Sequence, residues 1–278
     1  MDYWKTRSKN FDTKFSRAKA YLSRFIVGRY LLSLRLRDHA FIYGTIARTY
    51  KQRVIKLLDV GCGSGQDIAS DPKCKCYGVD IKGFPREVAL QKGYVEAAEY
   101  GEDGTIPFAP GFEVAIIVNV IAHVSDEIQI KMFRETKRLL KPDGLCIIVA
   151  EVDNDGFSYG LFKKISKRRF VDFVLGMDHT NLKPELEFEK NIHSAGLSIE
   201  KKETITGHML PIMHYFSYFF SRSPYKQLRY LSLVVDIALS VIDSLLIWLF
   251  QSAMQGRRFR VGYLCRVSGN RKQNTCAE

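Results

Sequence analysis

One stretch of the sequence, "IKLLDVGCGSGQDIA" (residues 55–69), constrains the fold more than any other. An apolar run ends there in one aspartate and three alternate glycines, and such a run is typical of a strand buried on both faces of a parallel sheet. Gly61, Gly63 and Gly65 leave the backbone bare of side chains, so a ligand can lie directly against the main chain. The stretch therefore predicts a nucleotide-binding turn between a strand and a helix.

Segments typical of strands and helices alternate along the rest of the chain. A helix is expected at about residues 38–50, and a second carries Ile128, Met132, Phe133 and Leu139 on its apolar side. Further strands are expected within residues 74–81, 93–100, 112–124 and 145–152, with a turn at 141–144, a helix, a glycine stop and a strand over 184–207, and a last strand at 257–269. Repeated strand–helix units favour an α/β fold with a doubly wound sheet.

Two segments stand apart from this pattern. Residues 9–32 predict a basic amphipathic helix, and no secretory signal is expected before it. Residues 208–256 are strongly apolar, and the part at 228–250 is long enough to cross a bilayer. Asp236 and Asp243 would each cost about 2.5–3.5 kcal/mol at the centre of a membrane span. A helix lying on the membrane surface, or a lid packed on the domain, is therefore favoured over a span.

The charge of the chain is concentrated at its ends. Residues 1–56 carry fourteen Lys and Arg against three Asp and Glu, and residues 257–278 carry six against one. The part between them carries twenty-two against twenty-six. Such asymmetry predicts contact with an anionic partner, either a membrane surface or nucleic acid. Nucleic acid is the less favoured partner, because basic residues do not interleave with aromatic residues as they do on a base-stacking surface.

The six cysteines do not form a metal-binding or disulfide pattern. They are scattered, and Cys74 and Cys76 form a lone C-x-C without a second pair at zinc-ligand spacing. Reduced thiols in a cytoplasmic protein are therefore expected.

The residues around the glycine turn indicate which class of nucleotide it binds. The turn lacks the later glycine of a dinucleotide fingerprint, and no Gly-Lys-Ser/Thr of a phosphate loop follows it. Asp80 ends the next strand, nineteen residues after Gly61, where a carboxylate can accept hydrogen bonds from both ribose hydroxyls.

At this point the sequence resembles the class I S-adenosylmethionine-dependent methyltransferases, and most closely their type 11 branch, which includes quinone-biosynthesis methyltransferases. The resemblance covers about residues 38–205. It is carried, in order, by "LLDVGCGSGQD", "GVDI", "IPF…FEVAIIVNVIAHVSD", "FRETKRLLKPDGLCIIVAE" and "LEFEKNIHSAGLSIE". It implies a seven-stranded mixed sheet of Rossmann-like type, with S-adenosylmethionine as the cofactor.

The resemblance also implies which residues hold the cofactor. The first motif, beside the methionine and ribose portions, matches Asp59, Gly61, Cys62, Gly63 and Gly65. Asp80 matches the ribose-binding acid, Ile81 the apolar residue beside the adenine, and Asn119 and Val120 the place where cofactor and substrate meet. Ala98 stands where the family usually has an acid near the adenine amine, and the neighbouring Glu99 is the candidate to replace it.

No metal is expected at this site. Some quinone O-methyltransferases of the family carry an E-x-x-E-H metal motif, but the matching residues here are Asn119, Ala122 and His123. His123 and His179 are instead the candidate catalytic residues, because imidazole can take a proton from a hydroxyl acceptor near neutral pH. A helix-start histidine and a surface-loop histidine are the respective alternatives.

The sequence thus predicts four parts: a basic amphipathic helix (1–37), a methyltransferase core (38–207), an apolar helical insertion (208–256), and a last strand with a tail (257–278). The favoured function is methyl transfer to an apolar or lipid-linked acceptor, such as a quinone, a polyprenyl- or lipid-linked sugar, or a lipid. We expect it in the cytoplasm, peripherally bound to an anionic membrane face. A soluble small-molecule methyltransferase with a helical lid, an RNA methyltransferase and a non-catalytic binder are the alternatives.

Overall fold

The structure is a computed structural model that describes residues 34–51, 53–66, 69, 71–153, 164, 180–206, 225, 227–228, 231, 238, 242, 245, 249 and 260–267. The expected amphipathic helix at 9–32 and most of the apolar insertion at 208–256 lie outside these residues. Within the described part of the chain, no helix combines the length and the apolar character that a membrane span needs.

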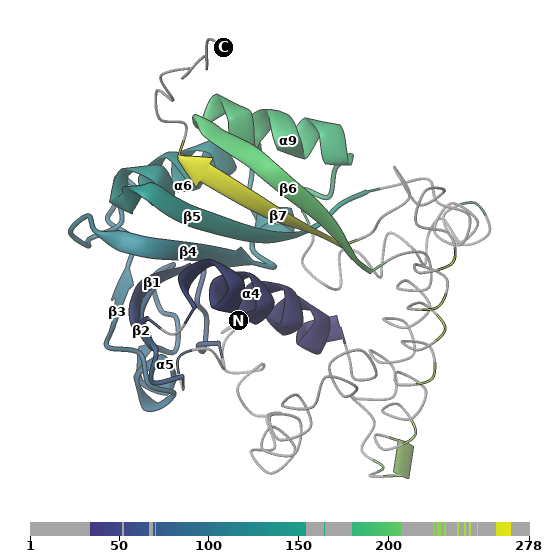
Figure 1. The fold of residues 1–278 in the computed structure, drawn as a ribbon, viewed down its shortest axis with the longest axis horizontal. Coiled ribbons are helices and arrows are strands. Elements are labelled where there is room, and N and C mark those ends of the chain that lie inside the picture. Colours follow the sequence, from purple (N-terminus) through teal and green to yellow (C-terminus); the bar gives the residue numbers. More distant parts are fainter. Residues whose placement is uncertain are drawn as a thin grey trace, which may run out of the picture.

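The core of the protein is one seven-stranded mixed sheet in the order β3-β2-β1-β4-β5-β7-β6 (Figure 1). The strands are β1 (Ile55–Val60), β2 (Cys74–Asp80), β3 (Glu96–Glu99), β4 (Phe112–Val118), β5 (Leu140–Glu151), β6 (Leu197–Thr206) and β7 (Arg260–Val267). The first five pair in parallel, whereas β7 runs antiparallel to β5 and β6. The strand order reverses between β1 and β4, and such a switch point is where open α/β sheets bind ligands.

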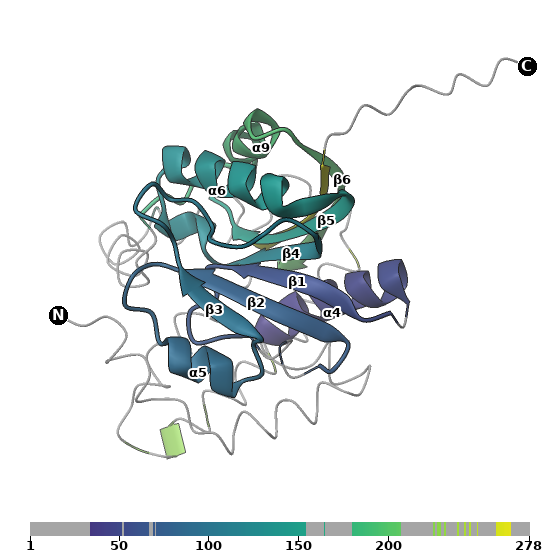
Figure 2. The ribbon, with the colours of Figure 1, turned by 90° about the vertical axis from the view of Figure 1, so that its left-hand side faces the viewer.

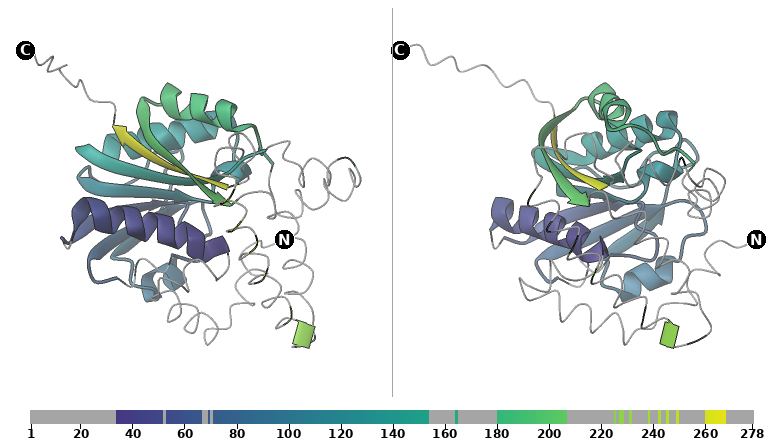
Figure 3. Two further views of the ribbon diagram at one scale, coloured as in Figure 1. Left: turned by 45° about the vertical axis from the view of Figure 1, so that its right-hand side comes forward. Right: turned by 90° about the vertical axis from the view of Figure 1, so that its right-hand side faces the viewer.

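Helices cover both faces of this sheet, as Figures 2 and 3 show. On one face, α4 (Leu34–Tyr50) and α5 (Arg86–Gln91) contribute Phe41 and Ala89 to a buried cluster. On the other face lie α6 (Asp126–Leu139) and α9 (Glu185–Ser194). Their Phe133 and Phe188 rings pack edge to face, with centroids 5.9 Å apart. The predicted α/β architecture is therefore confirmed.

Most of the expected elements occur where the sequence pattern placed them. Residues 55–60 form a strand buried at five of its six positions, as a central parallel strand requires. α6 begins after Ser125, whose side chain accepts the Ile128 N–H, and Asp126 lies in its first turn. α9 is followed by Gly196 at φ +77°, which confirms the expected glycine stop.

The expected turn at residues 141–144 takes a different form. β5 includes these residues, but its pairing with β4 is irregular there. Phe112 pairs with Leu140 and Val114 pairs with Leu145, so β5 advances five residues while β4 advances two. The surplus residues leave the ladder as a bulge, and regular pairing resumes at Leu145.

A buried ionic cluster joins three distant parts of the chain at the carboxyl end of β5. Arg260, the first residue of β7, donates to Asp38 Oδ2 of α4 over 2.9 Å and also forms an ion pair with Glu151, the last residue of β5. All three side chains are almost fully buried. Burial alone would lower the pKa of Arg260, but the charges of Asp38 and Glu151 hold this pKa above its ordinary value.

Replacement of Arg260 by methionine should lower the free energy of unfolding by about 3–5 kcal/mol, because it leaves two buried carboxylates without their shared cation. Urea denaturation at pH 7 measures this loss. Lys201→Ala is the matched control, since it removes the cation of the exposed Lys201–Glu203 pair and should cost less than about 1 kcal/mol. Equal losses in the two variants would contradict the prediction.

Candidate functional site

The glycine turn follows β1 directly and takes a backbone form that other residues rarely adopt. Gly61, Gly63 and Gly65 have φ values of +79°, +52° and +85°. The N–H groups of Gly61 and Cys62 both donate to the Val79 carbonyl of β2, over 2.8 and 3.1 Å. These bonds hold the start of the turn against the carboxyl end of the neighbouring strand.

Gly61 also brings the turn into contact with the residue after β4. A Cβ atom at position 61 would lie 2.3 Å from Val120 Cγ2, which is far closer than two carbon atoms can approach. Only glycine therefore lets Val120 pack against the turn. The structure thus brings together two of the predicted cofactor-binding positions, which are fifty-nine residues apart in the sequence.

Asp80, at the end of β2, holds the middle of the glycine turn by a hydrogen bond. Its Oδ2 accepts the Gly63 N–H over 2.6 Å and its Oδ1 accepts the Ile81 N–H over 2.7 Å. Burial raises the pKa of Asp80, while these two N–H groups act to lower it. A carboxylate has about four lone-pair sites, so each oxygen can still accept a further hydrogen bond. The predicted proximity of Asp80 to the glycine turn is thus present in the structure.

Asp59, the last polar residue of β1, lies beneath the turn rather than in it. The carboxyl group is fully buried, and the Tyr94 hydroxyl donates to Oδ2. Burial raises the pKa of Asp59 to about 7, although the hydrogen bond from Tyr94 acts to lower it. The neighbouring Cys62 thiol is also buried, which raises its pKa. Both residues therefore shape the turn from inside.

Tyr94 and Lys92 are candidate functional residues that the sequence did not reveal. The Tyr94 hydroxyl accepts the Gln66 N–H over 2.8 Å, and Lys92 Nζ donates to the Gly65 carbonyl over 2.7 Å. Both lie between α5 and β3, in a segment that resembles no motif. A hydroxyl directed at a buried carboxylate has no local sequence signal, because the partner is thirty-five residues away.

The side chains expected beside an adenine ring lie on β3 and on the segment after β2. Ala98 is half-buried in β3, opposite Val79. Glu99 Oε1 accepts the Gly83 N–H over 2.8 Å and so holds the segment that follows β2. Ile81, in the same segment, is 59% exposed. One carboxylate oxygen of Glu99 is thus engaged with the backbone.

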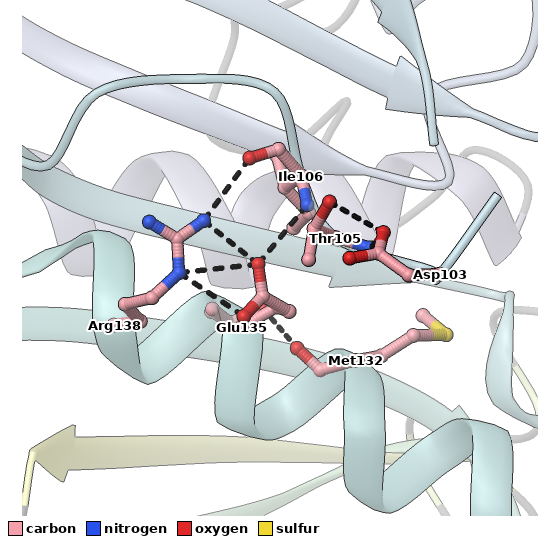
Figure 4. Close-up of polar contacts among 7 residues, drawn as sticks. Asp103, Thr105, Ile106, Met132, Glu135 and Arg138 are labelled. Atoms are coloured by element: carbon pink, nitrogen blue, oxygen red, sulfur yellow. Dashed lines mark hydrogen bonds and ion pairs between the residues drawn. The ribbon is translucent and has the colours of Figure 1, made fainter. Parts of the chain in front are cut away.

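The loop after β3 is fixed to α6 by a polar network, shown in Figure 4. The Ile106 N–H donates to Glu135 Oε2 over 3.0 Å, and the Ile106 carbonyl accepts from Arg138 over 3.1 Å. Arg138 and Glu135 also pair with each other. Earlier in the loop, Asp103 accepts from the Thr105 hydroxyl over 2.7 Å and from its N–H. The loop that borders the predicted adenine side is therefore held by a turn of its own at Asp103 and Thr105 and by the bonds of Ile106 to α6.

Asn119 follows β4 in a strained conformation. Its φ is +56°, in the left-handed region, where a residue with a Cβ is uncommon. The N–H donates to the Val149 carbonyl of β5 over 3.0 Å, while Oδ1 is buried without a hydrogen-bond partner in the described residues. Such strain and such an unpaired polar atom cluster at functional sites. Asn119 therefore remains a candidate contact for cofactor or acceptor.

His123 follows Asn119 by four residues and ends η2 (Ile121–His123). Its backbone carbonyl accepts the Thr180 hydroxyl over 3.2 Å, and Asn181 bonds to the Ala122 and Val124 carbonyls. These contacts fold the segment at 180–181 over the start of α6. An open pocket of about 390 Å³ lies there, lined by Ser125, Asp126, Thr180 and Asn181. His179 itself lies outside the described residues, so its proposed role stays a prediction.

The described residues contain no group of three or more His, Cys, Asp or Glu side chains that could hold a metal ion. They do fit an adenosyl group. The turn offers backbone without side chains, Asp80 offers free lone pairs for two hydroxyls, and both lie at the switch point of the sheet. The resemblance places the cofactor against these same groups.

Comparison with known proteins identifies the family of the chain. The family model described as a methyltransferase domain matches residues 33–202. A curated relative, the norajmaline N-methyltransferase of Rauvolfia serpentina, is 26% identical over 137 residues, which cover 45% of this chain. The chain therefore spans about half the length (46%) of that relative.

Solved structures share the fold at low sequence identity. A cyclopropane synthase from Mycobacterium tuberculosis has a TM-score of 0.53 and 13% identity, with 82% of this chain and 83% of that chain covered. Geranyl diphosphate C-methyltransferase from Streptomyces coelicolor A3(2) has a TM-score of 0.51 and 13% identity, with 82% and 76% covered. At these identities the likeness shows the fold alone.

Asp59→Asn should remove part of the pH dependence of stability. Between about pH 4 and 7 the folded protein keeps the Asp59 proton while the unfolded chain has lost it, so the free energy of unfolding falls as pH rises. The asparagine cannot ionise. The free energy of unfolding of the variant should therefore rise relative to that of wild type as pH increases, by on the order of 2–4 kcal/mol over the whole window. Urea denaturation at pH 5, 6, 7 and 8 measures it, and parallel curves would refute the prediction.

Proposed function

The chain belongs to the methyltransferase domain family, and from that premise we propose that it transfers a methyl group from S-adenosylmethionine to an apolar or lipid-linked acceptor. The observation that carries the first half of this proposal is the hydrogen bond between Gly63 and Asp80. It joins a bare backbone turn to a carboxylate that retains lone pairs for a ribose. These are the two contacts that an adenosyl group needs from the protein.

The protein's part in the reaction is chiefly positional. The cofactor supplies an activated methyl group on a sulfonium, so little further activation of the donor is required. Gly61, Gly63 and Asp80 would fix the adenosyl end, and Val120 with Asn119 would border the place where the methyl and the acceptor meet. Holding two reactants in line removes much of the entropic barrier to their reaction.

His123 is the proposed base for a hydroxyl acceptor. It ends η2, four residues after Asn119, and its ring is partly buried. An imidazole with an ordinary pKa near 6.5 can accept a proton at neutral pH. Thr180, which bonds to the His123 carbonyl, directly follows His179, the second proposed catalytic residue. A histidine base suits O-methylation more than it suits transfer to carbon.

Two observations support an apolar acceptor: the apolar composition of residues 208–256, and the substrate of one solved protein that has the same fold. The insertion at 208–256 precedes β7, and β7 begins at the carboxyl end of β5, next to the predicted site. Among the solved proteins with this fold, one is a C-methyltransferase of geranyl diphosphate, which is itself a prenyl compound. The proposal includes a peripheral position on an anionic membrane, drawn by the basic ends of the chain.

Asp80→Ala should weaken the binding of S-adenosylhomocysteine at least tenfold. A hydrogen bond to a charged group contributes about 1.5–3 kcal/mol, and 1.4 kcal/mol corresponds to a tenfold change. Titration calorimetry measures the affinity, and circular dichroism checks that the variant is folded. Asp71→Ala is the control, because Asp71 lies before β2 at the opposite edge of the sheet. Unchanged affinity in a folded Asp80→Ala protein would exclude the proposed donor site.

Vesicle flotation tests the membrane part of the proposal. The full chain should float with vesicles that contain anionic phosphatidylserine at 50 mM salt, and the bound fraction should fall several-fold at 500 mM as its charges are screened. Vesicles of phosphatidylcholine alone are the control. If the protein floats with neither at either salt, it is a soluble methyltransferase and the insertion is only a lid.

A further inference from the structure

Tyr94 stands out among the buried residues because its side chain contacts both Asp59, in the strand that enters the glycine turn, and the end of the turn at Gly65 and Gln66. Its ring is 5% exposed. The hydroxyl donates to Asp59 Oδ2, below the turn, and accepts the N–H of Gln66, at the end of the turn. One oxygen atom thus links the strand that enters the turn to the segment that leaves it.

The ring of Tyr94 makes a second set of contacts. A Cβ at Gly65 would lie 2.9 Å from Tyr94 Cε2, and a Cβ at Gly78 would lie 2.9 Å from Tyr94 Cε1. The ring therefore fills the space that two absent side chains leave open, one in the turn and one in β2. Nearby, Lys92 Nζ donates to the Gly65 carbonyl and holds the same end of the turn.

We propose that Tyr94 is the positioning residue of the methyl-donor site, holding the glycine turn in its binding conformation through hydrogen bonds to Asp59 and to the Gln66 N–H. This inference rests on the proposed function, which supplies the ligand. Tyr94 itself does not touch the reacting atoms. It acts through the turn, whose three glycines have alternative conformations available and would otherwise lose more backbone entropy on binding.

The charge of Asp59 makes this arrangement sensitive to pH. The hydroxyl of Tyr94 binds an ionised carboxylate more strongly than a neutral one. Burial raises the pKa of Asp59 to about 7, so protonation near neutral pH weakens this hydrogen bond and loosens the turn. The other titratable groups that face Asp59 are Asp80 and Cys76 of β2, Lys92, Cys62 of the turn and Tyr100.

Tyr94→Phe is the sharpest test, because it keeps the ring against Gly65 and Gly78 and removes only the hydroxyl. Affinity for S-adenosylhomocysteine, measured by titration calorimetry at pH 8, should fall about tenfold. Tyr50→Phe is the matched control. It removes another tyrosine hydroxyl with a backbone partner, the Glu113 carbonyl at 2.8 Å, at the amino end of β4. It should leave the affinity unchanged.

A pH series adds a measurement that a loss of general stability would not produce. In wild type, affinity should fall as pH decreases through about 7, because Asp59 becomes neutral. The Tyr94 hydrogen bond acts to lower the pKa of Asp59, so its removal should move the midpoint of this fall to higher pH. Tyr50→Phe should keep the wild-type midpoint.

The outcomes separate this inference from the proposed function. If wild type and Tyr50→Phe bind S-adenosylhomocysteine and folded Tyr94→Phe binds equally well with the same midpoint, Tyr94 is not a positioning residue and the function stands. If wild type does not bind, both ideas fail. Should Tyr94→Phe not fold, Asp59→Asn decides, because it replaces the carboxylate that accepts the Tyr94 hydroxyl: a folded Asp59→Asn protein that binds S-adenosylhomocysteine at pH 8 as tightly as wild type would overturn the inference.

Discussion

The hydrogen bond from the Gly63 N–H to Asp80 is the contact on which the candidate site depends. It connects the turn after β1 with the end of β2 across 2.6 Å, and it uses a backbone donor that only a bare turn can present at that place. The parallel pairing of β1 with β2 brings the two ends to one edge of the sheet. The turn is then held on its other side by Val120, which packs where Gly61 has no Cβ. The order of the strands, the glycines of the turn and the position of Asp80 together fix the conformation of the candidate site.

Much of this arrangement could be predicted from the sequence, because its causes are local. The buried run before Gly61, the spacing to Asp80 and the glycine after α9 each show in a few consecutive residues. Their positions in the fold follow from the rule that carboxyl ends of parallel strands meet at one edge. The fold class and the contact between the turn and Asp80 therefore agree with the structure. The roles of His123, His179 and the other site residues remain proposals.

What the sequence did not reveal arises from pairs of residues far apart in the chain. Tyr94 meets Asp59 across thirty-five residues, and Arg260 meets Asp38 across 222. Neither partner of such a pair belongs to a recognisable motif. The two residues meet only because the fold brings their segments together. Glu99 shows the same limitation. One of its oxygens accepts the Gly83 N–H, a contact that the sequence did not reveal, while its role beside an adenine stays a prediction. Backbone partners of this kind carry no pattern of residue types.

The position of β7 has a consequence for how the molecule is made. β7 lies between β5 and β6 in the sheet, yet it is the last of the three to leave the ribosome. Until residues 260–267 emerge, β5 has an open edge and β6 has no neighbour among the described strands. Open edges of this kind invite mispairing with other chains. The nascent polypeptide must therefore hold an unfinished sheet throughout the synthesis of residues 207–259, the most apolar part of the sequence, which makes chaperone protection most valuable at that stage.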